Sequence, residues 1–288
     1  MTKPIFIWAG GKNKMLKHYA NVMPSKVDSY CEPFFGGGAM FIHVMNRYQP
    51  KYAHINDVNP DIISIYSSIK EHFDEFLDRL NFLESKYIPL SKEDRKKYFY
   101  EVREEHAWDY QKWSKVQESA TLYFLMKTGF NGIYQLNKNT NGRYGTPSGL
   151  LNQKEEIYNR DVLWWWNAAL QNVTITSQDW SECTNHPDTF YFLDPPYRDS
   201  FADYGNAFDD SKLISLIEFS NTQANVMLCN RDSGDGWFEK HKLSLDILKF
   251  PITYTAGRRK KTENGFEAKR ATEVLLYRTC STSVQTTS

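Results

Sequence analysis

The chain has 288 residues, a length that suits one large domain or one domain with a sizeable insertion. Lysine plus arginine number 35, and aspartate plus glutamate also number 35, so the formal net charge is zero. This balance excludes a uniformly basic nucleic-acid-binding surface, so a surface of that kind must be local.

The cysteine and hydropathy patterns exclude several other classes of protein. The four cysteines contain no CxxC pair, which argues against a zinc site or a disulfide framework and favours a reducing cytoplasm. The first apolar run is too short for a signal peptide. No stretch approaches the roughly 18 apolar residues of a membrane helix, so we expect a cytoplasmic protein with no membrane partner.

The first part of the chain alternates between strand-like and helix-like segments. Strands are predicted at 27–32 and 52–57, with a helix at 39–48 between them. Asn59 and Pro60 form a typical N-cap and first-turn pair for a second helix. A charged helical region then spans about 74–128. It ends at a Gly-, Asn- and Thr-rich loop, 129–149, and long loops in compact domains are usually functional.

After a helix near 153–171, further strands are predicted at 172–177, 189–193, 224–230, 243–250 and 273–279. Strands alternating with helices predict an α/β fold with a doubly wound, mostly parallel sheet. We expect a catalytic domain of residues 1–57 and 172–280, a helical insertion at 58–171, and a disordered tail at 281–288.

The segment CEPFFGGGAMF, residues 31–41, joins a predicted strand to a predicted helix. Glycines there let the backbone approach a ligand, and the helix N-terminus favours anionic or polar groups. Asp57 ends the next strand, where such folds place an acid that binds ribose hydroxyls. The pattern indicates an adenosine-containing cofactor. Because the third glycine of GxGxxG is missing, a structural turn or a dehydrogenase also fits this loop.

The segment FYFLDPPY, residues 190–197, places an acid and two prolines at the end of a buried strand. Proline cannot continue a strand ladder, but its carbonyl remains an acceptor. Asp194, the carbonyls of Pro195 and Pro196 and the ring of Tyr197 together suit a planar amine, such as the amino group of a base. Two acceptors on that amine would expose its lone pair to a methyl group held in line.

These segments, together with FIWAGGKNKML, GFNGIYQLN, GRYGTPSG, AGRRKKTENG and EVLLY, resemble the Dam-type DNA adenine N6-methyltransferases of the D12 class, alpha group. The resemblance covers residues 5–278 in the family's order. It implies a Rossmann-like methyltransferase fold, S-adenosyl-L-methionine as cofactor, and site-specific methylation of an adenine flipped out of double-stranded DNA. It also implies Asp194, Pro195, Pro196 and Tyr197 as the catalytic motif.

The resemblance further implies which residues bind the cofactor and which bind DNA. The expected cofactor-binding residues are Trp8, Ala9, Gly11, Lys12, Glu32, Pro33, Phe34, Gly36, Gly38, Asp57, Asp179 and Trp180. The expected DNA-binding residues are Lys127, Phe130, Asn131, Ile133, Gln135, Asn137, Arg143, Pro147, Arg258, Arg259, Lys260 and Lys261. Among them, Phe130 corresponds to an aromatic wedge in the base stack, and Ile133 and Pro147 to contacts with thymine methyl groups.

The sequence departs from the GATC-specific members of that family at two positions. Ile7 stands where they carry a lysine, and Gln135 where they carry an arginine. Ile7 cannot donate a hydrogen bond, and glutamine prefers adenine to guanine. GATC and a related or relaxed A-T-containing site therefore both remain open.

Other functions fit part of the pattern. The same chemistry could act on RNA or on a protein amide, a nucleotide-dependent oxidoreductase would explain the glycine loop alone, and a DNA-binding module could have lost catalysis. Nothing in the sequence calls for a metal, and the sequence does not predict an oligomeric state.

Overall fold

A computed structural model describes residues 2–8, 11–149, 156–183, 188–198, 208–254, 260–262, 265–267 and 269–280. The chain packs into two compact units. Unit 1 comprises Met1–Lys14, Phe35–Arg47 and Ala53–Cys183, and unit 2 comprises Met15–Phe34, Tyr48–Tyr52 and Thr184–Ser288. These units do not coincide with the domains expected from the sequence, whose catalytic and recognition roles stay predictions. The tail at 281–288 lies outside the described residues.

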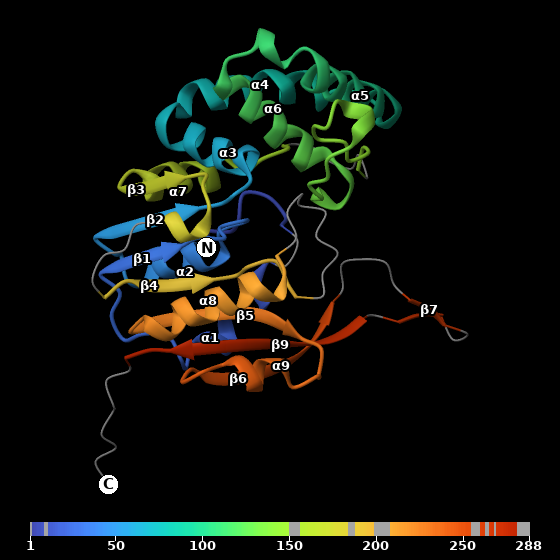
Figure 1. Ribbon diagram of the computed structural model, residues 1–288. Helices are drawn as coiled ribbons and strands as arrows, with labels where there is room; N and C mark the ends of the chain where they lie inside the picture. Colours follow the sequence, from blue (N-terminus) through green and yellow to red (C-terminus); the bar gives the residue numbers. More distant parts are fainter. Residues whose placement is uncertain are drawn as a thin grey trace. The chain divides into compact units, whose positions relative to one another are not determined.

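The strands form a seven-stranded sheet in the order β3-β2-β1-β4-β5-β9-β6 (Figure 1). Their bounds are Ser29–Glu32 for β1, Tyr52–Asn56 for β2, Val173–Thr176 for β3, Phe190–Leu193 for β4, Asn225–Asp232 for β5, Asp246–Tyr254 for β6 and Lys269–Arg278 for β9. The pairs β1–β4, β2–β3 and β4–β5 are parallel, whereas β9 is antiparallel to β5 and β6. The structure therefore confirms the predicted mostly parallel α/β sheet.

Helices of the described chain lie in the segments for which the sequence predicts helices, and the structure also has shorter helices outside those segments. The α-helices are α1 Leu16–Tyr19, α2 Ala39–Arg47, α3 Pro60–Glu71, α4 Phe73–Tyr87, α5 Lys92–Trp108, α6 Lys115–Thr128, α7 Arg160–Leu170, α8 Asp210–Thr222 and α9 Trp237–His241. Short 3-10 helices are η1 Lys12–Lys14, η2 Tyr110–Lys112, η3 Phe130–Gly132, η4 Lys138–Thr140 and η5 Trp180–Glu182. None of the described helices combines the length and the hydropathy needed to cross a membrane.

Helix α3 begins where the sequence predicts. The Asn59 side chain accepts a hydrogen bond from the Asp61 N–H at 3.0 Å, and Pro60 occupies the first helical position, where a missing N–H costs nothing. Helix α6 begins with a capping box between Ser114 and Gln117. Local side-chain chemistry thus sets these two helix starts.

Unit 1 has an aromatic core built on helical spacing. In α7, Trp166 is fully buried while Trp164 is 55% exposed, so the tryptophan run has one buried and one exposed face. The Trp166 ring stacks on Phe41 of α2 at a centroid distance of 5.4 Å and lies 5.1 Å from Tyr66 of α3. These contacts anchor α2, and with it the glycine loop that precedes this helix.

Unit 2 contains the strands on either side of the point where the strand order reverses. Successive strand residues point to opposite faces of a sheet. Accordingly, Tyr191 of β4 packs edge-on against Phe219 of α8 at 5.1 Å, whereas the next residue, Phe192, packs against Tyr19 of α1 at 6.3 Å. Helices therefore cover both faces of this part of the sheet, as the doubly wound prediction requires.

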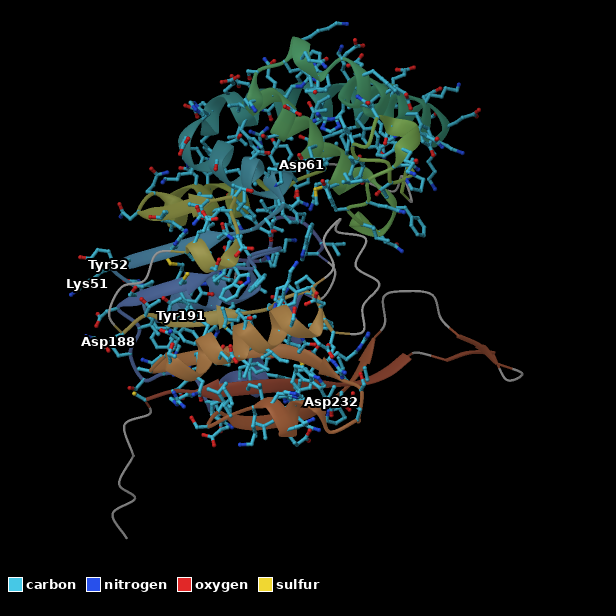
Figure 2. The ribbon with its side chains drawn as sticks, viewed as in Figure 1. Lys51, Tyr52, Asp61, Asp188, Tyr191 and Asp232 are labelled. Atoms are coloured by element: carbon cyan, nitrogen blue, oxygen red, sulfur yellow. The ribbon has the colours of Figure 1, made fainter. Side chains whose placement is uncertain are left out.

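The two ends of the parallel strands in unit 2 differ in role. Figure 2 shows Lys51, Tyr52 and Asp188 on the left, where β4 begins, and Asp232 on the right, where β5 ends. Ligands of open α/β sheets bind beyond the carboxyl ends of the strands, close to the reversal of strand order. The fold therefore predicts a ligand site at the residues that follow β1 and β4, where the strand order reverses.

Candidate active site

The carboxyl ends of β1 and β4 lie side by side within unit 2. The two strands are parallel with Cys31 opposite Tyr191, so Glu32 and the residues after it leave the sheet next to the residues after Leu193. The same edge of the sheet therefore carries the predicted catalytic residue Asp194 and three predicted cofactor-binding residues, Glu32, Pro33 and Phe34. This edge is the switch point at which the fold places ligands.

The predicted catalytic segment, residues 194–197, follows β4 and is partly buried. Pro195 is buried, while Asp194, Pro196 and Tyr197 are partly exposed. The Tyr197 hydroxyl donates a hydrogen bond to Glu273 Oε1 at 2.7 Å. Because Asp194, Pro196 and Tyr197 are only partly buried, their exposed atoms can contact a ligand.

Glu32 is fixed at the end of β1. It is 2% exposed and accepts a hydrogen bond from the Tyr30 hydroxyl at 2.6 Å. Burial, together with the adjacent Glu32 carboxylate, raises the pKa of Tyr30 well above its ordinary value, so the phenol remains a donor. Farther along, the Phe34 ring meets Phe208 edge to face at 5.7 Å. Glu32 and Phe34 are thus held by protein contacts in unit 2.

The glycine loop of unit 1 meets Trp8 closely. Gly36 has φ 49°, and a Cβ there would lie 2.5 Å from Cδ1 and Nε1 of Trp8. Gly38 has φ 67°, and a Cβ there would lie 2.7 Å from the Trp166 ring. Both positions need glycine, because the left-handed conformation and the missing side chain are required together. The predicted cofactor residues Trp8 and Gly36 are therefore in direct contact.

Asp57 holds the same loop from the end of β2. Its Oδ2 accepts the Gly36 N–H at 2.8 Å and its Oδ1 accepts the Asn59 N–H at 3.0 Å. Burial raises the pKa of Asp57, and the two backbone hydrogen bonds partly oppose that rise. Each carboxylate oxygen has a second acceptor position, so the side chain can fix the loop and still accept hydroxyl groups of a ligand.

Asn56 is a residue that the sequence analysis missed. It is 1% exposed, its Oδ1 accepts from the Thr176 hydroxyl and the Gln178 N–H, and its Nδ2 donates to the Gln178 carbonyl at 3.1 Å. The amide thereby joins the carboxyl ends of β2 and β3. In the sequence, the one signal for this role is the position of Asn56 directly before Asp57, at the end of β2.

The remaining predicted cofactor residues follow β3, follow β1 or lie at the start of η1 and just before it. Asp179 is exposed and caps η5 by accepting the Ser181 N–H at 3.0 Å, while the adjacent Trp180 is partly exposed. The Gly11 N–H donates to the Trp8 carbonyl at 3.1 Å, and Lys12 is only 3% exposed. Pro33 is buried, and Ala9 lies outside the described residues.

Loop 129–149 folds back on itself in unit 1. Phe130 N–H donates to the Pro147 carbonyl at 2.8 Å, Gly145 N–H to the Gln135 carbonyl at 2.7 Å, and Asn137 N–H to the Arg143 carbonyl at 3.0 Å. Asn131, with φ 54°, turns the chain in the left-handed region that asparagine tolerates. Six predicted DNA-binding residues of this loop are exposed, namely Phe130, Asn131, Ile133, Gln135, Asn137 and Pro147.

The two predicted phosphate-binding cations of this region have protein partners instead. Arg143 forms an ion pair with Glu118, and its guanidinium lies 3.7 Å from the centroid of the Tyr110 ring. Lys127 Nζ lies 3.4 Å from the Ile5 carbonyl, and burial lowers the pKa of this lysine. These contacts tie both side chains into unit 1, so their DNA contacts remain predictions.

The predicted basic loop contains a short antiparallel pair, β7 (Lys260–Thr262) and β8 (Gly265–Glu267), with Lys261 opposite Phe266. This strand pair lies in the segment that contains the predicted DNA-binding residues Lys260 and Lys261. Lys260 and Lys261 lie in β7, but their side chains are not among the described ones, and Arg258 and Arg259 lie outside the described residues.

Comparison with known proteins decides the family. Residues 8–248 match the model of the D12 class N6 adenine-specific DNA methyltransferases. The chain belongs to this family. It is 30% identical over 245 residues to the type II methyltransferase M.MjaIII of Methanocaldococcus jannaschii, covering 79% of this chain and 84% of that one.

Other methyltransferases are similar to this chain over comparable lengths. The type II methyltransferase M.CviBI of a Paramecium bursaria Chlorella virus is 32% identical over 232 residues, 78% of this chain and 81% of the relative. The DNA adenine methylase of Escherichia coli is 25% identical over 272 residues, 89% of this chain and 91% of the relative. This D12 class chain is thus an adenine-specific DNA methyltransferase, which removes support from the oxidoreductase alternative.

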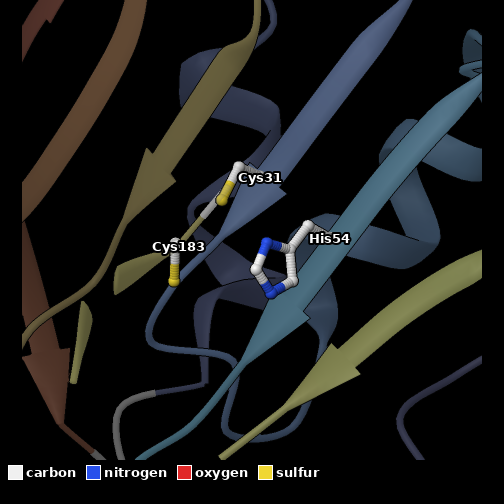
Figure 3. Close-up of side chains that lie close together, drawn as sticks. All are labelled: Cys31, His54 and Cys183. Atoms are coloured by element: carbon white, nitrogen blue, oxygen red, sulfur yellow. The ribbon is translucent and has the colours of Figure 1, made fainter. Parts of the chain in front are cut away.

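Two further side chains of unit 1, His54 and Cys183, lie close together. Figure 3 shows His54 on β2 and Cys183 after η5, and also Cys31 on β1 of unit 2. A ring nitrogen of His54 and the Sγ atom of Cys183, the atoms that could bind a metal ion, lie within 4.8 Å of one another. His54 Nε2 is 2.8 Å from the Thr176 hydroxyl oxygen, and burial lowers the pKa of this histidine. In this D12 class enzyme, His54 therefore serves as a neutral group that links β2 to β3.

Proposed function

We propose that this enzyme transfers a methyl group from S-adenosyl-L-methionine to N6 of an adenine flipped out of double-stranded DNA. The observation that carries the proposal is the position of the catalytic segment. Asp194 leaves β4 beside the carboxyl end of β1, at the reversal of strand order, with family membership established over residues 8–248.

The residues present fit S-adenosyl-L-methionine. Trp8 offers an aromatic face directly against Gly36, and Asp57 and Asp179 offer carboxylate oxygens for ribose hydroxyls or a cationic group. In unit 2, Glu32 adds a buried carboxylate. When bound, the cofactor supplies a methyl group on an activated sulfonium.

The chain's own residues prepare the amine that receives this methyl group. The exocyclic amine of adenine is a poor nucleophile, because its lone pair is delocalised into the ring. We assign Asp194 Oδ and the Pro195 carbonyl as acceptors of its two protons, and the Tyr197 ring as the surface on which the base stacks. Asp194 or solvent would accept the N6 proton that the amine loses when it is methylated. Holding the partners in line contributes on the order of 7–11 kcal/mol at best.

Loop 129–149 supplies the tools for opening the duplex. Phe130 is 44% exposed and Ile133 is 46% exposed, although both are large and apolar. Exposed apolar groups on a polar loop mark an interaction surface. Extruding a base costs a few kcal/mol of unstacking, which insertion of the Phe130 ring would offset. This exposure favours duplex DNA over RNA or a protein amide as the substrate.

We propose a recognition site with an internal A followed by T, either GATC or a related or relaxed sequence. Ile7 is 67% exposed and lies against Gly132 of loop 129–149, and Gln135 is exposed in the same loop. Replacing a bidentate guanine contact by an apolar group costs about 1–3 kcal/mol of discrimination at that position. We place this activity in the cytoplasm.

A methylation map tests the proposal. The purified protein and S-adenosyl-L-methionine are incubated with unmethylated genomic DNA, and modified adenines are mapped at single-base resolution. Methylated adenine within one recurring motif supports the proposed function, and the motif reports what Ile7 and Gln135 permit. Absence of any modified adenine, with transfer to RNA or to protein in parallel reactions, would refute it.

A further inference from the structure

Hydrogen bonds join the last residue of the proposed catalytic segment, and the residue after it, to other parts of unit 2. Four hydrogen bonds form three contacts: the Tyr197 hydroxyl bonds to Glu273, the Arg198 N–H bonds to Asn230, and the Arg198 guanidinium bonds to both Asp210 and Asp235. The proposed chemistry places the reacting amine against this segment, so the position of the Tyr197 ring decides where the base lies. Contacts that fix the ring are therefore candidates for positioning residues.

The first contact fixes the Tyr197 ring itself. Its hydroxyl donates to Oε1 of Glu273, a residue of β9 that is 3% exposed. A hydrogen bond to a carboxylate is in general stronger than one between neutral groups. With both ends held, by the backbone and by the hydroxyl, the ring cannot swing about its Cα–Cβ bond.

The second contact fixes the backbone that follows the ring. Asn230 of β5 is fully buried, and its Oδ1 accepts the N–H groups of Arg198 at 3.0 Å and of Arg231 at 2.9 Å. Its Nδ2 has no hydrogen-bond partner among the described residues. The Asn230 Oδ1 therefore ties the residue after the proposed catalytic segment to the end of β5, the strand adjacent to β4.

The third contact is made by the Arg198 side chain. Its guanidinium binds Asp210 of α8 at 2.8 Å and also Asp235, and it lies 4.8 Å from the centroid of the Trp237 ring of α9. The side chain is 17% exposed. Two carboxylates and an aromatic face from separate segments surround one guanidinium, which is the kind of site that favours arginine over lysine.

We propose that Glu273 and Asn230, with Arg198 and its two carboxylates, form a clamp that positions the Tyr197 ring for the base, so that Glu273 and Asn230 are positioning residues for methyl transfer. The clamp rests on the proposed function. Glu273 acts through the Tyr197 hydroxyl and Asn230 through the Arg198 N–H. Neither needs to touch the substrate, and misplacement of the ring by about 1 Å can cost on the order of a hundredfold in rate.

The test compares kcat and KM of the full-length protein on one duplex oligonucleotide that carries the mapped site. Tyr197→Phe removes only the hydroxyl, Glu273→Leu removes the acceptor, and the double variant removes both. We expect each single variant to lose about tenfold to hundredfold in kcat with KM for S-adenosyl-L-methionine nearly unchanged. Because both remove the same bond, the double variant should lose no more than the worse single variant.

Matched controls separate positioning from general damage. Tyr48→Phe also deletes a phenolic hydroxyl of unit 2, one that donates to the Pro24 carbonyl at 2.7 Å, and it should keep the kcat of the wild type. Glu239→Gln breaks an ion pair with Lys249 and should also keep it. Glu273→Gln, which keeps an acceptor oxygen, should restore part of the activity that Glu273→Leu loses.

A wild-type kcat for Tyr197→Phe would overturn the clamp, and so would additive losses in the double variant. If Glu273→Leu does not fold, Tyr197→Phe alone decides, since it leaves the ring and its packing in place. A wild-type protein that methylates no adenine would refute the proposed function itself. The clamp is judged separately, by the ratio of the variant kcat to the wild-type kcat.

Discussion

Replacing Gly36 with alanine tests whether Trp8 and the glycine loop form one wall of the cofactor site. The new Cβ would lie 2.5 Å from two atoms of the Trp8 ring. That is about 1 Å inside the ordinary carbon contact of roughly 3.5 Å, so the ring must move by about that distance. The φ of 49° adds about 1–2 kcal/mol of backbone strain for a residue with a side chain.

The two effects have different readouts. A displaced ring loses an aromatic contact worth about 0.5–1.5 kcal/mol, which raises the Kd for S-adenosyl-L-methionine about 2- to 12-fold. The strain lowers the melting temperature by about 2–8 °C, at roughly 2–4 °C per kcal/mol for a chain of this size. Isothermal titration calorimetry measures the Kd, and thermal unfolding measures the melting temperature.

Gly142→Ala is the matched control. Gly142 has φ 72°, and a Cβ there would meet nothing within 4 Å, so this variant carries the strain without the steric conflict. Both variants should lose stability, and only Gly36→Ala should lose cofactor affinity. If the two variants bind S-adenosyl-L-methionine equally well, Trp8 does not line the cofactor site.

Three further predictions concern chemistry, specificity and pH. Asp194→Ala should abolish methyl transfer while calorimetry still detects cofactor binding, and near-normal turnover would contradict the assigned mechanism. Gln135→Arg should shift preference toward guanine at one outer position of the mapped motif, whereas an unchanged profile removes Gln135 from recognition. Burial, helped by Arg143, lowers the pKa of His106 from 6.5 to about 3, so this contribution to stability is complete above pH 6.5 and falls as the pH drops. Between pH 6.5 and 5 the loss approaches about 2 kcal/mol, and His106→Leu should remove it in urea unfolding at the two pH values; parallel pH profiles would contradict the assignment.

Several features could be predicted from the sequence because they depend on neighbouring residues. Asn59 and Pro60 start α3 through contacts within three residues, and the period of α7 alone separates buried Trp166 from exposed Trp164. The alternation of strands and helices predicted the sheet. The acid and two prolines after β4 indicate a catalytic segment, and that role stays a prediction. The resemblance carried by those segments predicted the family.

Tertiary structure alone decided how those residues are held. Glu273 lies 76 residues from Tyr197 along the chain, and Asn56 lies 122 residues from Gln178, yet each pair is joined by a hydrogen bond. Likewise, the sequence predicts Arg143 as a DNA-binding residue, and only the structure shows its ion pair with Glu118 and its contact with the Tyr110 ring. Local patterns specify where a side chain emerges from its strand or loop. Its partner depends on which strands become neighbours in the sheet, and that is settled only when distant apolar faces pack together.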